Sequence, residues 1–127
     1  MPVVQHINDQ TRPEGCTATA AGVFRVSTDS GRFDCHYHDY AEYWLVYRGK
    51  AKVMSEDQHY YVQPGDIVCT KAGDEHDVVE VYQDLEAFYL EEAGPDNGRR
   101  GHLHRSQSKA AGHLVPALSL PADFPQR

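Results

Sequence analysis

Between residues 22 and 92 the chain consists of short runs rich in Val, Tyr and Phe, separated by Gly, Pro, Asp and Ser. Runs of this length and composition favour strands, and no apolar stripe at helical spacing is long enough to predict a helix. Many short, closely spaced strands are typical of a sandwich or barrel, so the pattern predicts an all-β domain. The predicted strands are 22–28, 43–47, 50–54, 60–63, 67–70, 78–82 and 87–90.

Turn signals lie between these runs. Gly49 separates two of them and can take the positive φ that a tight turn requires, so a turn is predicted at 48–50. At 64–66 a Pro-Gly-Asp sequence predicts a second turn, in which proline presets one dihedral angle and glycine supplies the left-handed one. A third turn, at 72–74, precedes His76.

The composition divides the 127 residues into one domain with two extensions. Residues 1–21 are predicted to form an N-terminal arm, and residues 22–92 the β domain. Residues 93–127 are predicted to form an irregular extension that packs on the barrel or on a partner subunit, with a helical turn at 106–112.

The net charge of −7 argues against partners that bind through Lys and Arg. Nucleic acids and anionic membrane surfaces are such partners, so neither is expected. Residues 1–6 lack the basic and apolar regions of a secretory signal. The cysteine count is three, and an odd count without a signal fits a reducing compartment, so the predicted location is the cytoplasm.

Histidine placement is the most informative functional feature. His36 and His38 are two residues apart, so in a strand their imidazoles leave the same face and can bind one metal ion. Glu42, just past a predicted bend, can reach the same ion as an anionic ligand, and His76 is the candidate fourth ligand. The alternative is that the pair lies on a sheet surface and binds no metal.

A second His-x-His pair, His102 and His104, lies in the predicted irregular extension without a carboxylate at similar spacing. These two side chains are therefore assigned to solvent or to packing of the extension. His6, His59 and His113 are isolated and are interpreted in the same way.

Together these residues resemble the two signature motifs of the cupin superfamily. Residues 31–49 read G-x4-H-x-H-x3-E-x6-G, and residues 65–76 read G-x7-G-x2-H. The family motifs are G-x5-H-x-H-x3,4-E-x6-G and G-x5-P-x-G-x2-H-x3-N. The chain departs from them by one residue fewer before the first histidine, by Lys71 in place of proline and by Glu80 in place of asparagine.

The resemblance implies an antiparallel double-sheet jelly-roll β-barrel with a divalent metal ion in its interior. It also implies that the ligands of this ion are His36, His38, Glu42 and His76. Three imidazoles and one carboxylate fit Fe, Mn, Ni, Co, Zn or Cu, and the pattern does not choose among them. Four ligands leave two positions of a six-coordinate ion for water or substrate.

Strand alternation suggests further residues near the ion. Val78, Glu80 and Tyr82 share the predicted face of His76, and an inward Glu80 beside a dication is a candidate acid or base. The alternative is that the strand turns outward and the Glu80 carboxylate is solvated. Tyr82 is a second candidate catalytic residue. Tyr89 can supply a phenolic donor, with core packing as its alternative role.

The strand at 43–47 is expected to have two unlike faces. Trp44 and Val46 share the parity of Glu42 and are expected to face the interior, Trp44 as a plain core residue or as part of the site. The other side chains of the strand then face a second sheet or a partner subunit. Because a small barrel leaves strand edges exposed, this strand and the N-terminal arm predict a homodimer.

The motifs favour a metal-dependent enzyme that polarises a small polyhydroxylated or carbonyl substrate, as a sugar isomerase or epimerase does. The sequence looks similar to small cupins likened to mannose-6-phosphate isomerase. A phosphorylated substrate would need basic residues at the pocket mouth, for which Arg25, Arg48 and Lys71 are candidates. The alternatives are an Fe(II)-dependent dioxygenase and a non-catalytic small-ligand-binding or sensor protein.

Overall fold

The computed structural model describes residues 3–94 and 100–127, so residues 95–99 of the predicted extension lie outside it. Its main sheet has five strands in the order β1-β6-β3-β4, with β5 also paired to β3, and β2 pairs with β7 in a second sheet. All strand pairs in both sheets are antiparallel. The elements are β1 (Ala20–Val26), β2 (Arg32–Phe33), β3 (Glu42–Ser55), β4 (Gln58–Val62), β5 (Ile67–Thr70), β6 (His76–Glu91), α1 (Gln107–Ala110) and β7 (His113–Leu114).

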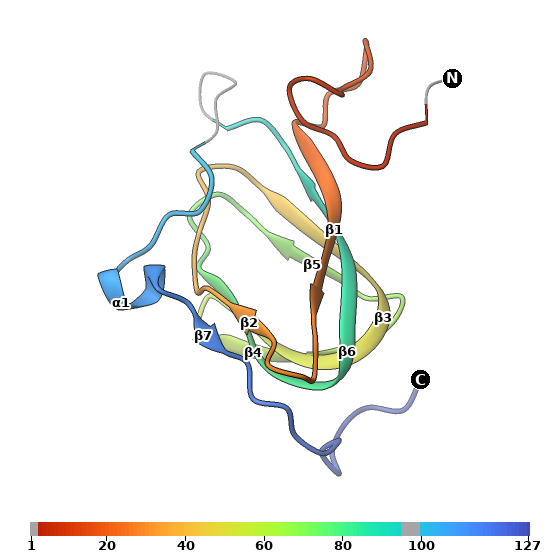
Figure 1. Cartoon of the computed structure of the whole chain (residues 1–127), viewed down its shortest axis with the longest axis vertical. Helices are drawn as coiled ribbons and strands as arrows, with labels where there is room; N and C mark the ends of the chain where they lie inside the picture. The colour runs from red at the N-terminus through yellow and green to blue at the C-terminus, as the bar shows by residue number, and fades with distance from the viewer. Residues whose placement is uncertain (1–2, 95–99) are drawn as a thin grey trace.

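The all-β prediction is confirmed, but the strand pairing of the described residues does not close a barrel. The main sheet has β1 at one edge and β4 and β5 at the other, beside different halves of β3. Figure 1 shows β3 and β6 as long, bent strands that curve together around the lower part of the molecule. The curvature encloses the interior face of the sheet, on which the core and the candidate site lie.

Two pairs of predicted strands merge into single long strands. The predicted turn at 48–50 is wrong, because β3 continues through it and the register against β6 shifts on both sides of Gly49. Gly49 does have a positive φ, of 86°. A turn and a β-bulge both need a residue with positive φ, so the local signal is the same for the two structures.

The core lies on the concave side of β1, β3 and β6. Its most buried members include Val26, Val53, Val81 and Leu85. Trp44 and Val46 are also buried in this core, as their parity with Glu42 predicts, whereas Leu45 and Tyr47 are exposed.

The C-terminal extension packs on the same domain. Val115 joins the core, β7 pairs with β2, and Ala117 bridges to β6 at Val81. The predicted helical turn is confirmed as α1, whose N-cap Ser106 accepts a hydrogen bond from the backbone N–H of Lys109. Among the described residues, no helix has the length and apolar character needed to cross a membrane.

Asp84 connects β6 to the end of β1. Its carboxylate accepts hydrogen bonds from the backbone N–H and the hydroxyl of Thr28, at 2.8 and 2.9 Å, and from Arg25 at 2.7 Å. The Thr28 backbone N–H, followed by Arg25, lowers the Asp84 pKa from 3.8 to about 2. A folded-state pKa below the unfolded value means that this carboxylate stabilises the fold above about pH 4 and that the contribution is lost as the pH falls toward 2.

We therefore expect Asp84→Asn to lower the melting temperature at neutral pH and to flatten its decline between about pH 4 and about pH 2. Thermal unfolding followed by circular dichroism over a pH series measures both effects. Parallel pH profiles for the variant and the wild type would contradict the expectation.

The cysteines differ in their surroundings: Cys35 is buried, whereas Cys16 and Cys69 are exposed, and all three are free. Burial is the main cause that raises the pKa of the Cys35 thiol to about 12. Because the thiolate is the reactive form, iodoacetamide at mild alkaline pH is expected to label Cys16 and Cys69 but to label Cys35 only after unfolding. Mass spectrometry counts the labels, and rapid triple labelling of the native protein would contradict this.

Candidate metal centre

Backbone pairing brings the two predicted ligand segments together. His36 lies between β2 and β3, and His76 is the first residue of β6. The two residues form an isolated antiparallel bridge, in which the His36 N–H donates to the His76 carbonyl at 3.1 Å and the His76 N–H donates back at 2.8 Å. Glu42 is the first residue of β3 and pairs with the last residue of β6, Glu91.

The four predicted ligands converge in the folded chain. His36, His38, Glu42 and His76 are all buried, and one donor atom from each lies within 4.8 Å of every other. Glu42 Oε1 lies 3.3 Å from His76 Nε2 and 3.8 Å from His38 Nδ1. When an octahedral ion lies about 2.1 Å from each donor, neighbouring donors are about 3.0 Å apart and opposite donors are about 4.2 Å apart. The donor set therefore fits a single divalent ion.

Neighbouring groups orient two of the imidazoles. The Nδ1 atoms of His36 and His76 hydrogen-bond to the backbone carbonyls of Asp34 and Asp74, which leaves each Nε2 for an ion. The Nε2 of His76 is buried and has no hydrogen-bond partner among the described residues. A buried imidazole nitrogen beside a carboxylate has the surroundings of a metal ligand.

Trp44 orients the carboxylate ligand. Its indole Nε1 donates a hydrogen bond of 2.9 Å to Glu42 Oε1, and both side chains are buried. Trp44 is therefore more than a core residue, because it also positions a candidate ligand. The shared parity of residues 42 and 44 was the sequence signal for this contact.

The surroundings of His36 and Glu42 keep these two donors in the protonation states that bind metal. Burial, followed by the nearby His76 and His102, lowers the pKa of His36 to about 3, so its imidazole is neutral near pH 7. Burial acts to raise the pKa of Glu42, but its contacts with His76 and Glu91 outweigh burial and lower the pKa to about 2. A neutral imidazole and an ionised carboxylate are the forms that ligate a cation.

A cavity of about 270 Å³ opens beside the cluster. Its lining residues are Phe24, Phe33, His36, Tyr89, Glu91 and His102. Aromatic walls with a few polar groups and one candidate ligand are typical of a small-molecule pocket. Tyr89 thus lies at the cavity, as one of its two predicted roles requires.

Glu80 and Tyr82 lie apart from the cluster. The Tyr82 hydroxyl donates to Glu80 at 2.7 Å, and Lys52 Nζ lies 3.2 Å from the same carboxylate. A register shift between Val78 and Glu80 breaks the parity with His76, and Val81 is buried instead. A catalytic role for Glu80 and Tyr82 stays a prediction, with no contact to the four ligands among the described residues.

Three residues in or beside the site were not expected there. Of the two roles expected for His102 and His104, packing of the extension is the one observed: both hydrogen-bond to Asp34, and His102 stacks on His36 at 3.6 Å between ring centroids. Their position beside the candidate metal ligands was not predicted. Glu91, which is buried opposite Glu42, was not singled out at all. Its parity with Tyr89 was the available signal.

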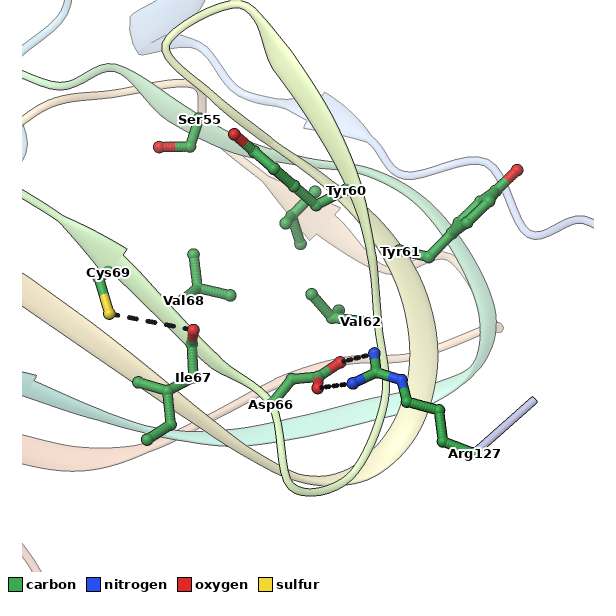
Figure 2. A pocket seen from close by; sticks show the side chains of 10 residues that line it. Ser55, Tyr60, Tyr61, Val62, Asp66, Ile67, Val68, Cys69 and Arg127 are labelled. Atoms are coloured by element: carbon green, nitrogen blue, oxygen red, sulfur yellow. Dashed lines mark hydrogen bonds and ion pairs between the residues drawn. The ribbon is translucent and has the colours of Figure 1, made fainter. Parts of the chain in front are cut away.

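A second cavity, of about 360 Å³, lies along β4 and β5 and has a different character. Figure 2 shows Asp66 and Arg127 at its rim, joined by an ion pair with N–O distances of 2.6 and 2.8 Å. It shares no lining residue with the cavity beside His36 and contains none of the four candidate ligands. The chemistry of the donor set therefore assigns the functional site to the cavity beside His36.

The cupin domain family (Cupin_2) matches residues 22–91, more than half of the chain. The chain belongs to the cupin family. Uncharacterized protein y4oW of Sinorhizobium fredii is 38% identical over 74 residues, which are 58% of this chain and 34% of that protein. The chain thus aligns with about a third of this relative's length.

Two crystal structures show the same fold at low sequence identity. A cupin 2 conserved barrel domain protein from Rhodopseudomonas palustris has a TM-score of 0.64 and 15% identity, over 79% of this chain and 66% of that one. The cupin-2 domain of Rru_A2000 from Rhodospirillum rubrum has a TM-score of 0.62 and 17% identity, over 79% and 64%. At these identities the likeness concerns the fold alone.

Proposed function

We propose that this cupin is an enzyme that binds one divalent transition metal through His36, His38, Glu42 and His76. Its proposed substrate is a small polyhydroxylated or carbonyl compound held in the cavity beside His36. The observation that carries the proposal is the convergence of four buried donors on one point beside this cavity. When bound, the metal supplies a Lewis acid that polarises a substrate oxygen.

The chain's own residues supply binding and proton transfer. Phe24, Phe33 and Tyr89 form aromatic walls that exclude water from the substrate. Glu91 lines the same cavity, is buried and pairs with Glu42 across the sheet. Two neighbouring buried carboxyl groups resist simultaneous ionisation, so we assign Glu91 as the group that holds and transfers the proton.

The surroundings of the cavity support a substrate without phosphate. Arg25 and Arg48 form ion pairs with Asp84 and Glu86, at 2.7 and 3.1 Å, and the lining residues described for the cavity include no Lys or Arg. Phosphate groups are bound mainly by such cations. The proposal therefore does not extend to the phosphosugar of a mannose-6-phosphate isomerase.

Metal identification is the first test of this function. Protein purified without chelator or nickel affinity resin is expected to carry at least one equivalent of a divalent transition metal by elemental analysis. NMR assays with unphosphorylated aldoses, ketoses and other small carbonyl compounds then test turnover. Absence of tightly bound metal would contradict the proposal. Iron together with oxygen consumption would favour the dioxygenase, and ligand binding without turnover would favour the non-catalytic protein.

The role of Glu91 has a separate test once a substrate is found. Glu91→Gln is expected to lower kcat by about 100-fold or more while the metal content is retained. Glu86→Gln, on the same strand but paired with Arg48, is the matched control and is expected to keep normal kcat. Equal kcat values for the two variants would contradict a proton-transfer role for Glu91.

We also propose that the protein is a homodimer. Four exposed apolar residues are paired side by side across β1, β6, β3 and β5 and form one row, namely Val23, Phe88, Leu45 and Ile67. The Arg48–Glu86 ion pair lies beside this row, so the edge of the apolar surface carries one positive and one negative side chain. In a symmetric dimer each of these charges can face the opposite charge of the second copy. Phe88→Glu is expected to shift the sedimentation mass from a dimer to 14.3 kDa, and a wild-type monomer would contradict the proposal.

Two finer expectations are also proposals. Membership of the cupin family supports a double-sheet jelly-roll barrel, and an experimental structure that shows pairing across the β4 and β5 edges would establish it. The three free cysteines support action in a reducing compartment, for which we propose the cytoplasm.

A further inference from the structure

The two His-x-His pairs of the chain lie side by side in the fold. Tyr37 and Leu103 form an isolated antiparallel bridge, with N–H to O distances of 2.9 Å in both directions. Because neighbours of bridged residues project to the same side of an antiparallel pair, the histidines that flank Tyr37 and Leu103 share one face. The His102 ring accordingly stacks on His36 with an interplanar angle of 7°.

This pairing creates a second donor set that shares no residue with the four buried ligands but adjoins one of them, because Asp34 Oδ2 lies 3.3 Å from His36 Nδ1. Asp34 Oδ2 lies 2.9 Å from His102 Nδ1 and 2.7 Å from His104 Nε2. The three donor atoms all lie within 4.8 Å of one another. The exposed fractions of the side chains are 26%, 51% and 20% for Asp34, His102 and His104, so solvent reaches the set.

We propose that Asp34, His102 and His104 form a second divalent-metal site. Two donors in neighbouring positions of an octahedral ion are separated by about 3.0 Å when each lies about 2.1 Å from the metal. Both distances from Asp34 Oδ2 are close to this value. Two of the three donor spacings are therefore those of neighbouring ligands, and the third, between the two imidazole nitrogens, is within 4.8 Å.

The chemistry of the donors defines which ions the site takes and how it holds them. Two imidazoles and a carboxylate suit Co, Ni, Cu, Zn, Fe or Mn, and three ligands leave positions for water. The site is more exposed than the first one, so we expect it to bind more weakly and to exchange its ion faster. Because His102 also lines the cavity, an ion held here lies at the cavity wall.

Metal stoichiometry tests the second site. The apoprotein is equilibrated with Co²⁺ by dialysis, and bound cobalt is counted by elemental analysis. The wild type is expected to bind two equivalents, the second more weakly. His104→Ala is expected to weaken the second equivalent by more than about 100-fold and to keep the first, since a lost ligand costs more than a lost outer-shell contact.

A second variant and a control keep this result interpretable. Asp34→Asn retains the size of the side chain and an acceptor oxygen but removes its charge, and it is expected to lose the same equivalent. His59→Ala removes an exposed histidine outside both clusters and is expected to bind two equivalents. His76→Ala is expected to lose the tight equivalent and to keep the weak one.

The outcomes separate this site from the proposed function. A wild type that binds one equivalent, retained in His104→Ala, would overturn the second site and leave the first in place. Two equivalents that persist in both His104→Ala and Asp34→Asn would also overturn it. A wild type that binds no cobalt would overturn both sites, and Asp34 would then serve only to hold the two imidazoles by hydrogen bonds.

Discussion

Substituting alanine for His76 is expected to remove the tightly bound metal from the buried centre. The substitution deletes one of four donors and leaves the carboxylate of Glu42 without the imidazole nitrogen 3.3 Å away. Loss of an outer-shell contact weakens metal binding by about 10- to 100-fold, so the loss of a ligand is expected to exceed about 100-fold. Elemental analysis after dialysis measures the effect.

The matched variants show whether the effect is local. His36→Ala is expected to lose the same ion, whereas His59→Ala is expected to keep it, because His59 is exposed and outside the cluster. Far-ultraviolet circular dichroism is expected to show a folded sheet in all three variants. Full occupancy of the tight site in His76→Ala would exclude this residue from the ligand set.

Replacing Gly49 with alanine is expected to destabilise the fold severely. A Cβ atom at this position would lie 1.9 Å from the carbonyl oxygen of Asp84, and the backbone has a φ of 86°. Because the obstacle is the backbone of the paired strand β6, relief requires the two central strands to separate. We expect a loss of roughly 4 kcal/mol in the free energy of unfolding, or failure to fold. Urea denaturation measures the loss.

Gly65 provides a control with the same backbone strain and no clash. Its φ is 97°, and a Cβ added there would meet no atom within 4 Å. Gly65→Ala is therefore expected to cost only about 1 to 2 kcal/mol, which is the penalty for a side chain in the left-handed region. Equal losses for the two variants would show that the close approach to Asp84 is unimportant.

Local patterns were sufficient for much of the fold. Strand-length apolar runs predicted the strands, and the predicted 67–70 coincides with β5 (Ile67–Thr70). The same patterns did not show that 43–47 and 50–54 belong to one strand. Whether Gly49 makes a turn or a bulge depends on whether a partner strand continues past it, and that partner, β6, begins 27 residues later at His76.

The candidate ligands and the residues around them also differ in how far local sequence patterns predict their positions. His36, His38 and Glu42 are close in the sequence and recognisable by their spacing, and His76 follows a turn signal that is equally local. The positions of Glu91 and His102 depend on contacts between distant segments, namely the pairing of β6 with β3 and of Leu103 with Tyr37. Spacing alone therefore did not place Glu91 or His102 beside the candidate ligands.

The amino-acid order alone predicted an all-β domain, because strand alternation and turn geometry act over a few residues, and its motifs, which resemble those of cupins, marked four candidate ligands. Only the folded chain showed that Glu80 contacts Tyr82 and Lys52, that Glu91 pairs with Glu42 and that a second histidine pair adjoins the first. These arrangements depend on register shifts and on pairing across the sheet, in which a displacement of one residue exchanges the buried and exposed faces.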